Sequence, residues 1–280
     1  MIMKESIKVL AGIVLYNPDI ERLRENVESI IDQVDEVLLV DNGSHNIEEV
    51  GVFVERYDRC GLIKNRSNLG IAAALNLVFD YALENAFDWV LTLDQDSICS
   101  NGLIDEYKKY LTLERVGMLT CIIKDRNINI HELEGQSNCE EVQRCITSGA
   151  FCSTAMFSEV GGFDEELFID WVDYEYCARI REAGFRIYKI GFCGLLHEIG
   201  RGEIKKLLFA ECTVINEAPI RVYYRTRNRL RVSRTFSEYT VRGALLASFK
   251  DMIKIVAFEE NKRDKLKALL KGIRDAGKAK

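Results

Sequence analysis

Two aspartates separated by one residue follow a short run of apolar, strand-forming residues. The stretch WVLTLDQDS, residues 89–97, places Asp94 and Asp96 at the end of this run. If the strand continues through Gln95, alternation points both carboxylates the same way, so that they can converge on one cation. Hard carboxylate oxygens suit Mg²⁺ or Mn²⁺, which proteins usually hold together with substrate phosphates. The motif predicts a site for a divalent metal and a diphosphate, and its simpler alternative is an acidic turn.

A second group of acids lies in the stretch FIDWVDYEYCARIREAG, which contains Asp170, Asp173 and Glu175. On a helix over 171–182, Asp173 and Glu175 lie about 200° apart, whereas Asp170 and Asp173 can share a side. Either of these two aspartates could act as a general base on a hydroxyl, beside apolar walls supplied by Trp171 and its aromatic neighbours. Acids in the first turn of a helix also simply stabilise the helix dipole, so a structural role is the alternative.

His197, in the string LLHEIG, is one of three histidines in the chain. A histidine at the end of a strand is a reasonable third metal ligand. A purely structural histidine is the alternative.

The stretch RVYYRTRNRLRVSR carries arginines at helical spacing, among them Arg221, Arg225 and Arg229. Guanidinium groups bind phosphate well, so an anionic acceptor or a leaving diphosphate could lie against this helix. A solvated basic helix face is nearly as good an interpretation.

Hydrophobic periodicity predicts the elements that must position these groups. The first 125 residues alternate strands rich in Val, Ile and Leu with helices, which is typical of a mostly parallel sheet covered on both faces. Ligands bind such sheets at the carboxyl ends of the strands. Polar segments follow the four predicted strands, beginning at Tyr16, Asp41, Asn65 and Asp94. The sequence therefore predicts an α/β fold with a binding site along one edge of its sheet.

Each polar segment also has a local explanation. Asn17 followed by Pro18 could start a helix, and Asn68 to Gly70 could cap another. Asp41 could cap the next turn, but it is better placed to accept hydrogen bonds from the N–H or hydroxyl groups of a ligand than to share the cation. The joint placement of the segments favours binding.

Bulk composition limits the class of protein. The 280 residues are 48% hydrophobic and 29% charged, which suits one large or two small globular domains. Nine scattered cysteines without a C-x-x-C pair indicate reduced, cytosolic thiols. The apolar N-terminus continues into NPD without a cleavage site, so we read it as a strand and not as a signal peptide. No segment reaches the roughly 18 uncharged apolar residues of a membrane span.

Charge is distributed unevenly along the chain. Residues 221–280 contain 17 Lys and Arg against 6 Asp and Glu, so they carry +11 and residues 1–220 carry −17 of the total of −6. The predicted helices of this region are 218–233, 237–258 and 261–275. A basic block on an acidic body predicts attraction to an anionic lipid surface, and a solvated helix face is the alternative. Nucleic acid is not expected, because no binding motif accompanies the charge.

Seven motifs occur in one order over most of residues 9–230: VLYNPD, LLVDNGS, NLGIAAALN, LTLDQDS, SGAFCSTAMFSEVGGFDEELFIDWVDYEYCARIREAGFRI, LLHEIG and YYRTRN. In this order they resemble the inverting family 2 glycosyltransferases of the GT-A fold, and within them the bacterial rhamnosyltransferases. The resemblance implies a glycosyltransferase domain over 1–235, with a nucleotide-sugar-binding half, 1–98, and an acceptor and catalytic half, 99–235. A basic helical extension, 236–280, follows.

The resemblance also implies roles for single residues. The family's acidic catalytic pair is usually Glu-Asp, and the matching positions here hold Val172 and Asp173, so Asp173 is the expected base. The implied donor-binding residues are Tyr16, Asn17, Asp41, Asn68, Gly70, Asp94 and Gln95. The family's D-x-D falls on Asp94 and Asp96, with Asp96 favoured as the direct metal ligand, and His197 matches a histidine near the leaving diphosphate. The expected ligands of Mg²⁺ or Mn²⁺ are therefore Asp94, Asp96 and His197. The acceptor or the leaving diphosphate is expected near Gly149, Trp171, Arg225 and Arg227.

The implied reaction is a single displacement with inversion at the anomeric carbon. The string LDQDS favours dTDP-β-L-rhamnose as the donor. The implied acceptor is a saccharide, or a saccharide on undecaprenyl diphosphate, in bacterial cell-surface polysaccharide synthesis. The expected location is the cytoplasm, at the inner face of the cytoplasmic membrane, and a homodimer is compatible with this.

Other classes of function compete with this interpretation. Another nucleotide-sugar donor would use the same fold. A phosphatase or phosphotransferase of the haloacid-dehalogenase type also uses D-x-D, but there the motif ends the first strand and here it ends the fourth. A Rossmann dehydrogenase is disfavoured, because no G-x-G-x-x-G follows the first strand. A non-catalytic nucleotide-sugar-binding protein would bind the donor without turnover.

Overall fold

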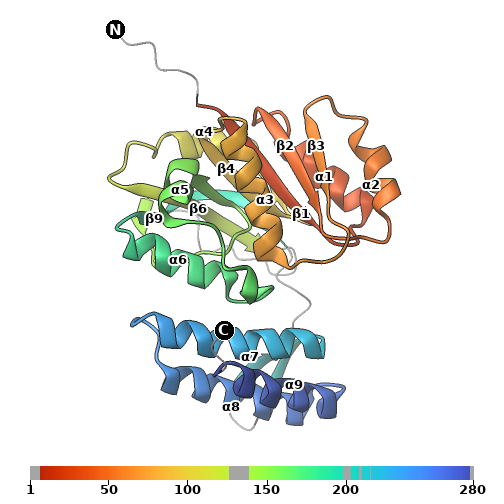
Figure 1. Cartoon of the computed structure of the whole chain (residues 1–280), viewed down its shortest axis with the longest axis vertical. Helices are drawn as coiled ribbons and strands as arrows, with labels where there is room; N and C mark the ends of the chain where they lie inside the picture. Colours follow the sequence, from red (N-terminus) through yellow and green to blue (C-terminus); the bar gives the residue numbers. More distant parts are fainter. Residues whose placement is uncertain (1–6, 126–138, 198–202, 208–209, 215, 278–280) are drawn as a thin grey trace. The chain divides into compact units, whose positions relative to one another are not determined.

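The computed structural model of the chain (Figure 1) describes residues 7–125, 139–197, 203–207, 210–214 and 216–277. Its contacts divide the chain into two units, and the division passes through one helix, α6. The first unit comprises Met1–Glu165 and Tyr176–Glu198, and the second comprises Glu166–Glu175 and Ile199–Lys280.

The first unit is built on one large sheet. Its strands are β1 Val9–Leu15, β2 Glu36–Asp41, β3 Cys60–Lys64, β4 Trp89–Asp94, β5 Ile98–Cys99, β6 Val116–Asp125, β7 Cys139–Glu141, β8 Ala150–Ser153 and β9 Arg186–His197. Their order is β3-β2-β1-β4-β8-β6-β9-β5, and β7 pairs with β9 outside this path. β4 therefore runs through the middle of the sheet, as its continuous apolar sequence predicts.

The predicted α/β fold class is confirmed, and the sheet itself is mixed. β3, β2, β1 and β4 are parallel to one another, as the strand and helix alternation of the sequence predicts. β8 then runs antiparallel to both β4 and β6, while β6 and β9 are parallel. Each antiparallel pair includes a strand that follows residue 125, beyond the stretch in which the sequence alternates strands and helices.

Helices cover both faces of the sheet. The helices of this part of the chain are α1 Ile20–Ile30, α2 Ile47–Val54, α3 Ile71–Glu84, α4 Leu103–Lys108, α5 Thr154–Val160, the 3₁₀ helix Glu165–Leu167, and α6 Val172–Glu182. The main core packs apolar residues of α1, α2 and α4 against one face. The other face receives α3 so closely that a Cβ on Gly12 of β1 would lie 2.2 Å from Cγ1 of Val78.

The second unit contains three long helices and a two-stranded ribbon. The helices are α7 Pro219–Thr235, α8 Val241–Phe258 and α9 Lys262–Asp275, and the strands are β10 Glu203–Leu207 and β11 Ala210–Val214. The three predicted helices are confirmed, but α8 begins at 241 instead of 237. The reason is Thr240, whose hydroxyl accepts a hydrogen bond from the N–H of Gly243 and caps the helix.

α7 packs with α8 and α9 as one unit (Figure 1). Val222 of α7, Ile255 of α8 and Leu269 of α9 share one small apolar core. The compact unit therefore includes α7, whereas the predicted extension begins only at residue 236. Of the helices described, none is both long and apolar enough to cross a bilayer.

Candidate active site

The predicted binding edge lies in the first unit, where β1, β2 and β4 end side by side. In the register of these parallel strands, Leu15 lies beside Asp41, and Val14 lies beside Asp94. The polar segments that follow the three strands are therefore brought to the same edge of the sheet.

Asp41 has one oxygen bound within the fold and one that is not. The residue is 1% exposed, and its Oδ2 accepts hydrogen bonds from the backbone N–H groups of Gly43 and Ser44, each at 3.0 Å. Oδ2 therefore caps the turn that follows β2, which is the structural alternative for Asp41. Oδ1 is also buried, and it has no hydrogen-bond partner among the described residues. Because an unpaired buried acceptor is costly, Oδ1 is suited to accept an N–H or O–H from a ligand.

Asn17 connects the loops that follow β1 and β2. It has a left-handed backbone, with φ of 49°. Its N–H donates to Oγ of Ser44 at 2.7 Å, and its Oδ1 accepts from the N–H of His45 at 2.8 Å. Asn17 is not a helix cap, because the side chain of Asp19 accepts the N–H groups at the start of α1.

Gln95 supports the loop that carries Tyr16. Its Oε1 accepts from the Tyr16 N–H at 2.8 Å, and its Nε2 donates to the Tyr16 carbonyl at 3.3 Å. The Gln95 side chain therefore joins the ends of β1 and β4, while Tyr16 itself remains 47% exposed. Direct contact of Gln95 with a donor stays a prediction.

Asn42 holds the segment before α3 and is not among the predicted donor-binding residues. Its Nδ2 donates to Oδ1 of Asn68 at 3.1 Å and to the carbonyl of Gly70 at 3.0 Å. Its Oδ1 accepts from the N–H of Leu69 at 3.0 Å. Gly70, with φ of 89°, directly precedes α3. The predicted residues Asn68 and Gly70 are thereby tied to the end of β2, next to Asp41.

Asp94, Asp96 and His197 form the predicted cation cluster. One ligand atom from each residue lies within 4.8 Å of the others. Nε2 of His197 lies 3.6 Å from Oδ2 of Asp94, and Nδ1 lies 3.4 Å from Oδ1 of Asp96. The Asp94 and Asp96 side chains are 37% and 28% exposed, so the cluster can be reached from solvent.

The surroundings of Asp96 favour its ionised form. Burial acts to raise the pKa of this carboxyl, but the hydrogen bond and charge of His197, with smaller contributions from the backbone and Arg22, lower the pKa below its ordinary value. Asp96 is therefore a carboxylate at neutral pH, which is the form that binds a cation.

Strand pairing brings His197 to the two aspartates across about 100 residues of sequence. β5 begins two residues after Asp96 and pairs antiparallel with the end of β9, placing Ile98 opposite Leu196. The β6–β9 pair then continues as far as His197. The short strand β5 is thus the element that joins both parts of the cluster.

Two buried serines support the cluster and are absent from the predicted site. Oγ of Ser97 lies 3.2 Å from Nδ1 of His197 and 2.7 Å from Oγ of Ser148. The Ser148 hydroxyl accepts the N–H of Asp94 at 3.2 Å. Both serines are at most 1% exposed. Hydrogen-bonding groups of this kind orient metal ligands. The sequence marks them only weakly, since Ser97 is simply the polar residue after D-x-D and Ser148 the one before Gly149.

We expect Ser97→Ala to weaken Mn²⁺ binding, because His197 loses a hydrogen-bond partner that sets its orientation. The expected loss is about tenfold to a hundredfold, measured by calorimetric titration of Mn²⁺ in the presence of dTDP. Ser100→Ala is the matched control, since the Ser100 hydroxyl donates to the carbonyl of Cys193 and not to the cluster. Equal Mn²⁺ affinity for Ser97→Ala and the unchanged protein would contradict the assignment.

The donor set of the cluster fits a divalent metal. Two carboxylates and one imidazole are suitable ligands for a metal ion of intermediate hardness such as Mn²⁺, and substrate phosphates can complete its coordination. Asp94, Asp96 and His197 would hold this ion.

The expected base lies just after a loop of unusual backbone conformation in the second unit. Phe168, Asp170 and Trp171 have φ of 62°, 63° and 70°, which is the left-handed region. Asn228 of α7 holds this loop, since its Nδ2 donates to the carbonyls of Leu167, Ile169 and Asp170 at 2.7–2.9 Å. Strained backbone that surrounding contacts maintain is common at functional sites.

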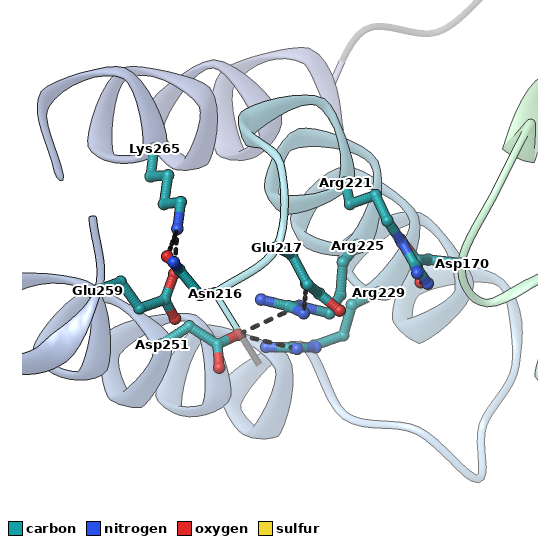
Figure 2. A network of polar contacts seen from close by, with 9 residues as sticks. All are labelled: Asp170, Asn216, Glu217, Arg221, Arg225, Arg229, Asp251, Glu259 and Lys265. Atoms are coloured by element: carbon teal, nitrogen blue, oxygen red, sulfur yellow. Dashed lines mark hydrogen bonds and ion pairs between the residues drawn. The ribbon is translucent and has the colours of Figure 1, made fainter. Parts of the chain in front are cut away.

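The two candidate bases differ in their partners. Asp170 is paired with Arg221, with Oδ1 2.6 Å from Nη2 (Figure 2). Asp173 lies in the first turn of α6, and its Oδ1 accepts the N–H of Tyr174 at 2.9 Å. Trp171 packs edge-on against the rings of Tyr174 and Tyr239, so aromatic side chains of this segment gather as expected. Which of the two aspartates acts as the base stays a prediction, and the resemblance favours Asp173.

The remaining predicted acceptor residues have contacts within the fold. Gly149, with φ of 79°, donates its N–H to Thr92 and accepts at its carbonyl from the Tyr107 hydroxyl. Arg227 donates to the carbonyl of Glu166 and lies over the Tyr224 ring.

Arg225 pairs with Glu217 and, at 3.9 Å, with Asp251 (Figure 2). The guanidinium groups of Arg225 and Arg227 thus already have acceptors in the fold. Their roles toward an acceptor or diphosphate stay predictions.

The fold and the cluster together define a GT-A glycosyltransferase. The model of the family described as glycosyl transferase family 2 matches residues 11–161, which is more than half of the chain. The chain belongs to this family, and the predicted resemblance is confirmed.

Individual relatives agree with this assignment. The dTDP-rhamnosyl transferase RfbF of Shigella flexneri is 29% identical over 290 residues, covering 95% of each chain. The mannosyltransferase PcManGT from Pyrobaculum calidifontis, solved with GDP-Man and Mn²⁺, has a TM-score of 0.61 at 13% identity, covering 96% of this chain and 86% of that one.

GalNAc-T7, solved with UDP, GalNAc and Mn²⁺, also has a TM-score of 0.61, at 14% identity. That match covers 81% of this chain, which spans about half, 48%, of the length of GalNAc-T7. These two likenesses concern the fold.

Proposed function

We propose that this glycosyltransferase moves L-rhamnose from dTDP-β-L-rhamnose to a saccharide acceptor in the synthesis of a bacterial cell-surface polysaccharide. The observation that carries the proposal is the Asp94–Asp96–His197 cluster at the same sheet edge as the buried Oδ1 of Asp41, which has no hydrogen-bond partner among the described residues. The choice of rhamnose is supported by the match to a dTDP-rhamnosyl transferase over 95% of each chain.

The two parts of this edge suit the two parts of a nucleotide sugar. The N3–H of thymine is a donor that Oδ1 of Asp41 can accept, and uracil has the same group, so Asp41 recognises the pyrimidine without selecting dTDP over UDP. Asp94, Asp96 and His197 would hold a divalent ion, which would supply positive charge against the diphosphate of the donor. His197 in this set favours Mn²⁺ over Mg²⁺.

The proposed transfer is one displacement. Asp173 takes the proton of an acceptor hydroxyl as its oxygen bonds to the anomeric carbon and the bond from that carbon to the diphosphate oxygen breaks. The products are the elongated saccharide with inverted anomeric configuration and dTDP. Asn228 contributes by holding the loop that precedes Asp173, and Trp171 contributes an apolar wall.

We further propose that the acceptor saccharide is carried on a lipid diphosphate and that the enzyme works in the cytoplasm, at the inner face of the membrane. The support is the charge of residues 221–280, with 17 Lys and Arg against 6 Asp and Glu. Cations near an anionic leaflet contribute about 1 kcal/mol each to binding.

A donor screen tests the proposed function. Calorimetric titration in Mn²⁺ should give dTDP-rhamnose a lower Kd than UDP-, GDP- and other dTDP-sugars, and acceptor-dependent release of dTDP should follow only with that donor. A preference for another nucleotide sugar would replace rhamnose and keep the transferase. Release of inorganic phosphate without sugar transfer would instead favour a phosphatase, and donor binding without turnover for any acceptor would favour a non-catalytic protein.

A further inference from the structure

α8 presents its large apolar side chains to solvent. Leu245, Leu246, Phe249, Ile253 and Val256 are between 36% and 56% exposed. With 100° of rotation per residue, these five positions fall within an arc of about 100° on one side of the helix. We call them the α8 stripe. A helix of a soluble domain normally turns such a stripe toward the core, but the residues that the structure describes leave the α8 stripe uncovered.

Small and charged residues occupy the opposite side of α8, which faces α7 and α9. Ala244 and Ser248 are buried there, together with Ile255. Asp251 lies 2.9 Å from a guanidinium nitrogen of Arg229 and 3.9 Å from one of Arg225 (Figure 2). These pairs fix the rotation of α8, because turning the stripe inward would remove Asp251 from both arginines and leave buried charges unpaired. The outward direction of the stripe is therefore built into the unit.

The exposed charged residues of α8 are both basic. Between Val241 and Phe258, the basic residues are Arg242, Lys250 and Lys254, and the one acid is Asp251. Arg242 and Lys250 are exposed, whereas the Asp251 side chain, 16% exposed, is turned toward α7. The outer surface of α8 is thus apolar and cationic without a carboxylate. An amphipathic helix of this composition suits the interface of an anionic bilayer, where apolar side chains enter the acyl region and cations meet the headgroups.

We propose that α8 docks flat on an anionic lipid bilayer through the α8 stripe, with Arg242 and Lys250 on the headgroups. A second copy of the chain fits this surface less well, since a symmetric contact would bring the same cations of both copies together without acids to pair them. This inference names the element and adds an apolar contribution to the membrane location proposed above; it rests on that location and not on the identity of the sugar donor.

Vesicle flotation of the full-length protein tests the docking surface. We expect binding to vesicles of phosphatidylcholine with phosphatidylglycerol, and weaker binding to phosphatidylcholine alone. The double variant Leu246→Ser/Phe249→Ser should lose roughly tenfold or more in partitioning at both low and high salt, because it removes apolar area. Lys250→Glu should weaken binding mainly at low salt. Val52→Ser, in α2 of the other unit and 57% exposed, is the matched control and should not change flotation.

A fluorescent variant reports insertion directly. On vesicle binding, the fluorescence emission of Phe249→Trp should shift to the blue and be quenched by brominated lipids. The unchanged protein gives the background signal from Trp89 and Trp171. Flotation equal for the double variant and the control, or no added quenching, would overturn the inference. A second contradicting result would be an unchanged protein that does not bind vesicles but has the mass of a dimer by light scattering, together with a double variant that has the mass of a monomer.

The same samples separate this inference from the proposed function. Transfer to a water-soluble acceptor and dTDP binding should be unchanged in the double variant. Transfer without vesicle binding would overturn only the docking surface, and vesicle binding without any sugar transfer would overturn only the proposed function.

Discussion

Replacing Asp173 with asparagine is expected to abolish sugar transfer while leaving donor and metal binding unchanged. The amide has the shape of the carboxylate and can still accept the N–H of Tyr174 through its oxygen, so the start of α6 should keep its structure. It cannot take a proton from the acceptor hydroxyl. General base catalysis contributes about 10²–10⁴-fold, so we expect kcat to fall by at least about a hundredfold. Acceptor-dependent dTDP release gives kcat, and calorimetry in Mn²⁺ gives the Kd for dTDP.

Asp170→Asn is the matched variant for this prediction. Asp170 precedes the same helix but is paired with Arg221, so its loss should weaken the loop without removing the base. Transfer by Asp173→Asn at an undiminished rate, together with inactive Asp170→Asn, would move the base to Asp170. Undiminished transfer by both variants would reject an aspartate base in this segment.

The second large effect is expected for Asp96→Ala, which should remove most of the metal dependence of donor binding. Asp96 supplies a carboxylate that the structure keeps ionised, and it lies 3.4 Å from His197. Without it, the site retains one carboxylate and one imidazole, too few protein ligands to hold Mn²⁺ well. We expect the affinity for Mn²⁺ in the presence of dTDP to fall by at least about a hundredfold, since even supporting partners of metal ligands are worth tenfold to a hundredfold.

Titrations of dTDP in Mn²⁺ and in EDTA measure this effect without relying on activity. In the unchanged protein the two Kd values should differ widely, and in Asp96→Ala they should nearly coincide. Asp105→Ala removes an exposed carboxylate of α4 that lies 4.0 Å from Lys108, and it should keep the wide difference. If Asp96→Ala kept that difference as well, Asp96 would not be a metal ligand.

Much of the candidate site could be predicted because its signals are local. The end of a buried strand is visible as an apolar run that stops at a polar residue, which identified Asp41, Asp94 and Asp96. Other side chains have uses that depend on contacts far along the chain. Gln95 adjoins the aspartates in sequence, yet its amide is bound to Tyr16, 79 residues away. Such pairings follow from the order of the strands in the sheet, and they produce no periodic pattern in the sequence.

The sequence by itself determined the fold class, the strand ends that carry the polar groups and the acidic types suited to a cation and a base, because hydrophobic periodicity and residue chemistry are properties of neighbouring residues. Only the tertiary structure decided that β5 brings His197 and Ser97 together, that Asn228 holds the loop before Asp173, and which side of α8 faces outward. These outcomes depend on hydrogen bonds and ion pairs between residues far apart in sequence, and a buried polar group stays there only where the assembled fold supplies its partner.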